Sequence, residues 1–124
     1  MRLLDANKWK RKIKKACKDA GTYKTFFDSV IDTLADILAR RDAAHEMFDE
    51  SGGEILVEHT NKGGATNIEQ NPAVRLINDL NRDALAYWRD LGLTPAGLKR
   101  INEGALKEQK GSALEQALAK LGGE

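Results

Sequence analysis

The sequence has few of the residues that build disulfides and metal sites. Its 124 residues include one cysteine, Cys17, and two histidines, His45 and His59. One cysteine cannot form a disulfide within the chain, which argues against a secreted, disulfide-bonded scaffold. Zinc sites usually combine several cysteine and histidine ligands, so a metal here would depend on carboxylates. The composition therefore predicts no internal disulfide, no metal site and no cofactor.

Long hydrophobic runs are also missing. No stretch approaches the ~18–20 consecutive apolar residues that a membrane span needs. The first residues, MRLLDANKWK, lack the apolar run and the small-residue cleavage site of a signal peptide. We therefore expect a cytosolic protein with no membrane partner.

Sequence motifs of catalysis are equally scarce. His45 and Glu46 do not form a zinc-binding His-Glu-x-x-His motif, because Asp49 stands where the second histidine would be. The glycine pairs at 52–53 and 63–64 lack the Gly-x-x-x-x-Gly-Lys-Ser/Thr order of a nucleotide-phosphate loop. The acidic residues do not converge on one point, so paired-carboxylate catalysis is not indicated. The sequence predicts a binding protein rather than an enzyme.

The length and composition fit one small domain. The chain has a mass of 13.7 kDa, with 41% hydrophobic and 31% charged residues. Small domains bury only ~60–70% of the surface of the unfolded chain, so the core should be thin. Self-association is expected, because it would bury apolar side chains that one chain leaves exposed.

Charge is unevenly distributed along the chain, although the net charge is only +1. Residues 1–24 contain nine Lys or Arg and two acidic residues, whereas residues 25–58 contain nine acidic residues and two arginines. A basic segment suits a polyanionic partner such as nucleic acid. The alternative is that the two segments pack side by side and neutralise each other.

Residues 7–20 are predicted to form a basic amphipathic helix that ends at Gly21. Its apolar side chains fall in one arc that includes Cys17, so we expect a buried thiol rather than a nucleophile. Its basic side chains fill about 200° on the other side. This face suits a phosphate backbone better than base reading or a membrane surface, since lysine is a point charge and the apolar face is narrow. The predicted DNA contacts are Lys8, Lys10, Arg11, Lys12, Lys14, Lys15 and Lys18.

A longer helix is predicted over residues 25–50, with Thr25 as its N-cap. The acidic residues opposite its apolar stripe are Asp28, Asp32 and Asp36. Farther along, Arg41 and His45 fall in the apolar sector. This predicts either a bend in the helix or contact with something polar, such as a neighbouring subunit.

The next segment combines a hairpin with a third helix. Residues 54–70 mix extended, β-branched character with turn residues, which predicts a β-hairpin. Asn71 and Pro72 form a cap and a first helical residue for a helix over 72–91, which Gly92 ends. The predicted fold class is therefore mainly α, a small helical domain with a short β-hairpin between the second and third helices.

The C-terminal part is expected to hold two shorter segments. A Thr-Pro pair at 94–95 starts a short helix over 95–103, which Gly104 closes. A capping-box pattern at 112–115 predicts a tail or a further helix over 112–121.

Two long amphipathic helices in a chain too small to cover both predict contacts between subunits. The candidate interface residues are Arg41, His45, Val74, Leu76 and Leu85.

Residues 71–101, NPAVRLINDLNRDALAYWRDLGLTPAGLKRI, resemble the small terminase subunits of tailed bacteriophages, specifically the P27 family. The most specific feature is Leu-Gly-Leu-Thr-Pro at 91–95, about twenty residues after the Asn-Pro pair at 71–72. Gly21 and Gly52 occupy the places of two family glycines, so the resemblance extends along most of the chain. Leu98 stands where the family commonly has an arginine, so no role of that arginine is carried over.

The resemblance implies a non-catalytic protein that recognises the viral genome at its packaging site and forms ring-shaped homo-oligomers. It implies double-stranded viral DNA and the large terminase subunit as partners, the latter holding the ATPase and nuclease. It also implies action in the host cytoplasm. The missing catalytic motifs agree with this division of labour.

Two other functions stay open. A helix-turn-helix regulator is suggested by Gly21 between a short and a long helix, although a recognition helix should begin with polar and basic side chains rather than Phe26 and Phe27. A head-assembly or connector protein would pair its basic helix with the aspartates of a neighbour. Salt-dependent DNA binding separates this last function from the other two.

Overall fold

The computed structural model describes residues 5–122, apart from the side chain of residue 109. In chain order its elements are α1 (Ala6–Ala20), the 3-10 turn η1 (Thr25–Phe27), α2 (Asp28–Glu50), β1 (Leu56–Thr60), β2 (Thr66–Gln70), α3 (Pro72–Asp90) and α4 (Pro95–Gly122). The prediction of a mainly α fold with a hairpin between the second and third helices is confirmed. Arg2, which belongs to the basic N-terminal segment, lies outside the described residues.

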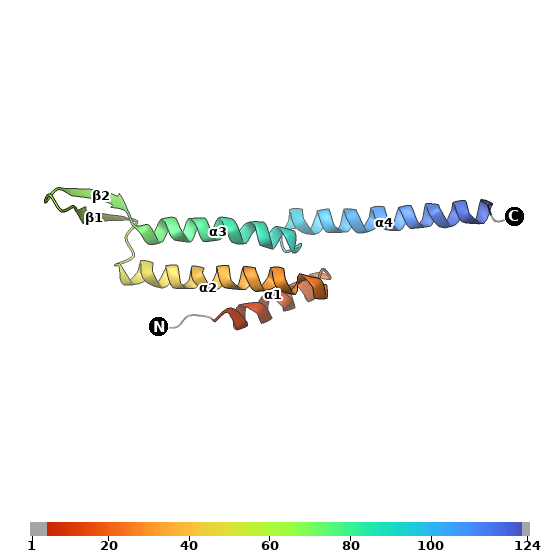
Figure 1. The fold of residues 1–124 in the computed structure, drawn as a ribbon, viewed down its shortest axis with the longest axis horizontal. Coiled ribbons are helices and arrows are strands. Elements are labelled where there is room, and N and C mark those ends of the chain that lie inside the picture. Colours follow the sequence, from red (N-terminus) through yellow and green to blue (C-terminus); the bar gives the residue numbers. More distant parts are fainter. Residues whose placement is uncertain (1–4, 123–124) are drawn as a thin grey trace.

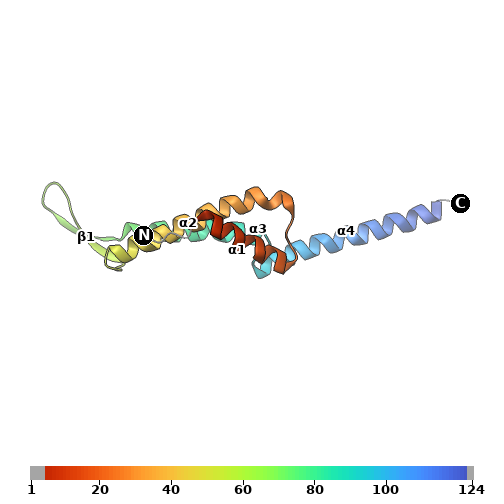
Figure 2. The ribbon, with the colours of Figure 1, turned by 90° about the horizontal axis from the view of Figure 1, so that it is seen from below.

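Three helices lie side by side and form the body of the molecule (Figure 1). α2 and α3 run antiparallel along each other, and α1 packs antiparallel on α2. The hairpin extends from one end of this body and α4 from the other, as the view from below also shows (Figure 2). The molecule is therefore long and thin, with a projection at each end.

The core lies where α1, α2 and α3 meet. Its buried side chains are Ile13, Cys17, Ile31, Leu34, Ala35, Ile37, Leu38, Ala44, Leu80, Ala84 and Leu91. Within each helix they recur three or four residues apart, as one face of a helix requires. Burying a leucine or isoleucine side chain fully contributes about 1.5–3 kcal/mol, so this narrow strip supplies most of the stabilisation of the body.

Both ends of α1 are capped. The Asp5 carboxylate accepts a hydrogen bond from the backbone N–H of Lys8 at 2.8 Å. Gly21 ends the helix in the left-handed conformation, with φ of 75°, as predicted. The next residue, Thr22, is buried, and its hydroxyl donates to the Leu91 carbonyl at 2.9 Å. The turn after α1 is thereby anchored to the end of α3.

The start of the second helix differs from the prediction. Thr25 is the first residue of η1, and α2 begins only at Asp28. Neither η1 nor α2 has a side-chain hydrogen bond at its N-cap. The prediction of Thr25 as an N-cap was wrong, because the chain enters α2 through a tight turn closed by the backbone N–H of Phe27 and the carbonyl of Lys24, 2.9 Å apart.

The hairpin stands away from the helical body. β1 and β2 pair antiparallel, with Leu56 opposite Gln70 and Thr60 opposite Thr66. Its side chains are exposed except for the half-buried Val57. A two-stranded hairpin is at best marginally stable alone in water, so its base needs a firm attachment.

Asn71 provides that attachment. Its buried side chain donates to the Ser51 hydroxyl at 2.7 Å and to the Glu54 carbonyl at 3.0 Å. Its amide oxygen accepts from the backbone N–H of Ala73 at 3.1 Å, which confirms the predicted cap of α3. One side chain therefore starts α3 and ties the hairpin to the end of α2.

The C-terminal part differs most from the prediction. The Thr94 hydroxyl caps α4 as expected, accepting from the backbone N–H of Gly97 at 3.0 Å. However, α4 then continues to Gly122, so the expected stop at Gly104 and the separate segment over 112–121 were both wrong. Glycine destabilises a helix interior by only about 1 kcal/mol, and it ends a helix where it adopts positive φ, which Gly104 does not.

The junction of α3 and α4 is closely packed around two glycines. Gly92 ends α3 with φ of 73°, as predicted, and a Cβ there would lie 2.7 Å from the Ile101 side chain. A Cβ on Gly97 would overlap the carbonyl group of Arg89. Glycine is therefore required at 92 for backbone conformation and at 97 for space.

Cys17 is expected to be unreactive in the native protein. Its side chain is fully buried, and this burial raises the pKa of the thiol, opposed by a hydrogen bond with Thr22. Reaction with a thiol reagent at pH 8 should be about tenfold or more slower than in denaturant. Because the folded pKa is raised, the thiol stabilises the fold below its unfolded pKa, and this contribution is lost as the pH rises through the folded pKa. Equal native and denatured reaction rates would contradict the burial.

Candidate nucleic-acid interface

The seven predicted DNA-contacting side chains lie together on the outer surface of α1. Five of them are exposed: Lys8, Arg11, Lys12, Lys15 and Lys18. Lys10 and Lys14 are half-buried because they lie on the flank that faces α2. With Ile13 and Cys17 turned to the core, the helical period directs the basic side chains outward. We call this set of seven side chains the α1 basic face.

Two cations of the α1 basic face pair with acidic residues of α2. The Lys10 ammonium lies 3.5 Å from the Asp32 carboxylate, and the Lys14 ammonium lies 4.0 Å from the Asp28 carboxylate. All four side chains keep between 38% and 57% of their exposure. The two oppositely charged segments therefore neutralise each other within one chain, but only in part.

The rest of the α1 basic face keeps a surplus of positive charge. Lys15 pairs with Asp19 of the same helix at 3.0 Å. Four cations have no ion pair with any described residue: Lys8, Arg11, Lys12 and Lys18. Because these side chains are exposed, their charges are available to a polyanion.

Trp9 explains how one end of the α1 basic face is held. Its indole N–H donates to the Asp42 carboxylate at 2.7 Å, and Lys12 lies over its ring at 5.1 Å from the centroid. Arg41 also faces this ring, at 5.8 Å, and donates to the Asn81 side chain at 3.2 Å. The polar intrusion of Arg41 into the apolar sector is thus accounted for by contacts with α1 and α3 of its own chain. A role for Arg41 between subunits stays a prediction.

Tyr23 holds the other end. Its hydroxyl donates to the Asp28 carboxylate at 2.9 Å, and its ring lies 5.2 Å from Lys14 and 5.3 Å from Lys18. The hydrogen bond with Tyr23 and the nearby charge of Asp28 raise the pKa of Lys14 above its ordinary value. Lys14 is therefore firmly cationic at neutral pH.

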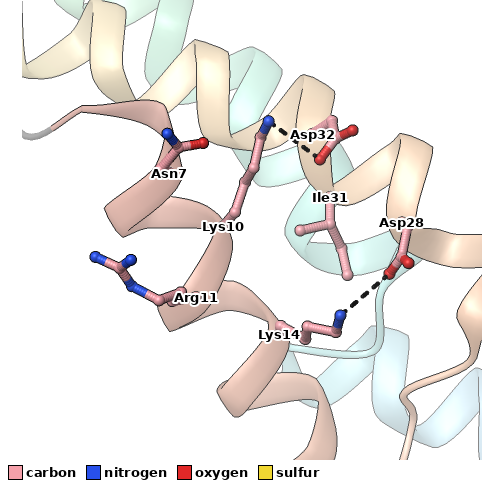
Figure 3. Close-up of a pocket in the computed structure, with 7 residues that line it drawn as sticks. All are labelled: Asn7, Lys10, Arg11, Lys14, Asp28, Ile31 and Asp32. Carbon is pink, nitrogen blue, oxygen red and sulfur yellow. Dashed lines mark ion pairs between the residues drawn. The ribbon is translucent and has the colours of Figure 1, made fainter.

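A shallow groove separates α1 from the first turns of α2. It is lined by Asn7, Lys10, Arg11, Lys14, Asp28, Ile31 and Asp32. Figure 3 shows Lys10 and Lys14 reaching across it to the aspartates, whereas Arg11 points away from α2. The groove itself carries both signs of charge, so a phosphate backbone is better matched by the outer side of α1 than by the groove.

Other kinds of site have little support in the described residues. Within residues 5–122, no group of three or more His, Cys, Asp or Glu is placed to hold a metal ion. The described helices include none that is both long and apolar enough to span a membrane.

Two of the predicted interface residues lie together. His45 and Val74 line an apolar hollow between the end of α2 and the start of α3, with Phe48, Ile55 and Ile77. His45 is exposed and Val74 is half-buried. The hollow is a possible contact surface that spacing along either helix alone does not reveal.

Leu76 and Leu85 lie on opposite edges of α3. Both are exposed, at 41% and 47%, but they are nine residues apart. At about 100° per residue, this separation turns their side chains about 180° from each other. The two leucines therefore cannot belong to one patch, although each can belong to a different contact.

The sequence analysis missed which residues neutralise the α1 basic face. The available signal is the spacing of four between Lys10 and Lys14 and between Asp28 and Asp32. Each pair occupies one side of its helix, and antiparallel packing of α1 on α2 brings the two pairs into register.

The chain matches a family model described as phage terminase, small subunit, over residues 6–108. The match covers α1, α2, the hairpin, α3 and the first half of α4. Comparison with curated proteins gives no match. Comparison with solved structures gives none either. The matched range contains the whole α1 basic face.

Proposed function

This chain belongs to the phage terminase small subunit family, and from that premise we propose that it binds viral DNA at the packaging site. In this role it recruits and regulates the large terminase subunit during genome packaging in the host cytoplasm. Membership of the P27 group within the family is part of the same proposal. It is supported by the Asn-Pro pair at 71–72 and by Leu-Gly-Leu-Thr-Pro at 91–95.

The observation that carries the proposal is the charge surplus of the α1 basic face. Four exposed cations without an ion pair in the described chain, Lys8, Arg11, Lys12 and Lys18, lie on one rigid helix. Lysine and arginine on a helix surface bind phosphates without reading bases, which suits positioning on a duplex. We propose that sequence selection at the packaging site adds to this contact.

Catalysis is assigned to the large subunit. The chain itself is proposed to hydrolyse neither ATP nor DNA, because its sequence has no phosphate loop and no convergent carboxylate set. Its task is then to hold DNA and to present it.

A ring is the proposed assembly. A cyclic ring needs two different, complementary surfaces on each subunit, because its contacts are head to tail. The opposite edges of α3 that carry Leu76 and Leu85 fit this requirement. The apolar hollow with His45 and Val74 offers a further surface for a neighbouring copy.

Leu85→Glu is expected to split the assembly without unfolding the subunit. Leu85 is 47% exposed in the single chain, so a carboxylate there costs the monomer little but is costly in a buried contact. Native mass should fall from a multiple of 13.7 kDa to 13.7 kDa itself, with unchanged helical content. Leu114→Glu, at the projecting end of α4, is the control and should leave the mass unchanged. An undiminished Leu85→Glu assembly would exclude this edge from the interface.

The function is tested by duplex binding at several salt concentrations, combined with native mass with and without phage DNA. We expect affinity to fall linearly with salt on logarithmic axes. A protein that stays monomeric in both states and binds no duplex at low salt would favour the head-assembly or connector function instead.

A further inference from the structure

We infer that Asp28 and Asp32 limit the affinity of the α1 basic face for DNA, by holding Lys14 and Lys10 in ion pairs that a phosphate must displace. This inference rests on the proposed DNA-binding function. It names two acidic residues as internal competitors of the DNA backbone, and it divides the basic face into free and held cations.

The geometry places the competition on one flank of α1. Lys10 and Lys14 are one turn apart, as are Asp28 and Asp32, and the antiparallel helices join them in two parallel bridges (Figure 3). The bridges measure 3.5 Å and 4.0 Å. The lysine side chains remain 38% and 44% exposed, so a phosphate can reach them from solvent.

Asp28 is itself held in place. Its carboxylate accepts a hydrogen bond from the Tyr23 hydroxyl at 2.9 Å. Tyr23 also contacts Lys14 through its ring, at 5.2 Å from the centroid. The acidic competitor is therefore preorganised beside its cation, rather than meeting it by chance on a mobile surface.

The strength of the bridges sets the size of the effect. Partly exposed ion pairs are weak in water, so the aspartates reduce DNA affinity without preventing binding. A duplex that captures Lys10 or Lys14 leaves an aspartate beside the phosphate backbone, which adds repulsion. Both effects disappear when the aspartates are neutral.

The test is the double variant Asp28→Asn with Asp32→Asn. Asparagine keeps the side-chain shape, and its amide oxygen can still accept the Tyr23 hydrogen bond. We expect duplex binding about 3- to 30-fold tighter than wild type at the same salt, which is what the release of two exposed ion pairs is worth. The slope of log affinity against log salt should steepen by up to about 1.8, or about 0.9 for each additional phosphate.

The matched control is Asp49→Asn with Glu50→Gln. It changes the net charge equally and lies on the same helix, but at the far end of α2, where both side chains are exposed. Helical content and melting temperature are measured for both double variants, so that a folding defect is recognised. A gain in affinity no larger than that of the control would overturn the inference.

A mutant cycle separates local pairing from general charge. In a Lys10→Gln background, Asp32→Asn should lose most of its effect, because the cation that it releases is gone. An undiminished effect would also overturn the inference. Absence of duplex binding by wild type and by both double variants at low salt would instead refute the proposed function itself.

Discussion

Replacing Arg11, Lys12 and Lys18 together with alanine is expected to weaken duplex binding roughly 10- to 100-fold at low salt and to flatten the salt slope by about 2.7. These cations are exposed and have no ion pair within the described chain, so each can neutralise a phosphate without first breaking a bridge. In a ring the loss repeats in every subunit, because weak contacts add through effective concentration. Binding measured by fluorescence anisotropy across a salt series gives both numbers.

The matched control removes the same charge from α3, by replacing Arg75, Arg82 and Arg89 with alanine. These arginines are exposed, and Arg82 makes only a surface ion pair with Asp79 at 3.5 Å. We expect a small, general effect of charge and a nearly unchanged slope. The reverse outcome, with the α1 variant binding normally and the α3 variant impaired, would move the DNA contact to α3.

Gly97→Ala is expected to destabilise the protein by about 1–3 kcal/mol, whereas alanine normally stabilises a helix relative to glycine. The added Cβ would meet the carbonyl of Arg89, and backbone atoms cannot swing aside as a flexible side chain does. The α3–α4 junction must therefore open or shift. Thermal unfolding followed by circular dichroism should show the melting temperature lowered by roughly 5–15 °C.

Gly104→Ala is the control for this prediction. It makes the same substitution in the same helix, but no atom lies within 4 Å of the added Cβ. The expected result has the opposite sign, with a gain of about 0.5–1 kcal/mol in local helix stability and more helical signal. If both alanine variants behaved alike, the close approach of α4 to Arg89 would be wrong.

Local chemistry in the sequence was enough for most helix ends. Gly21, Asn71, Gly92 and Thr94 act as predicted because caps and left-handed stops depend on residues within one turn. Thr25 and Gly104 show the limit of that reasoning. A cap or a stop needs a particular backbone conformation as well as a suitable residue, and neighbouring packing selects that conformation.

The same division holds for the candidate site. Helical periodicity alone placed seven cations on one side of α1 and Cys17 on the other, because a period of 3.6 residues is a property of the single helix. The meaning of each cation was decided only when α1 packed on α2. The distances from Lys10 to Asp32 and from Lys14 to Asp28 depend on helix direction and register, which residues far apart in the sequence fix through the shared core. The sequence thus determined which face is basic, and the tertiary structure decided which of its charges are free, since charge pairing depends on distance in space.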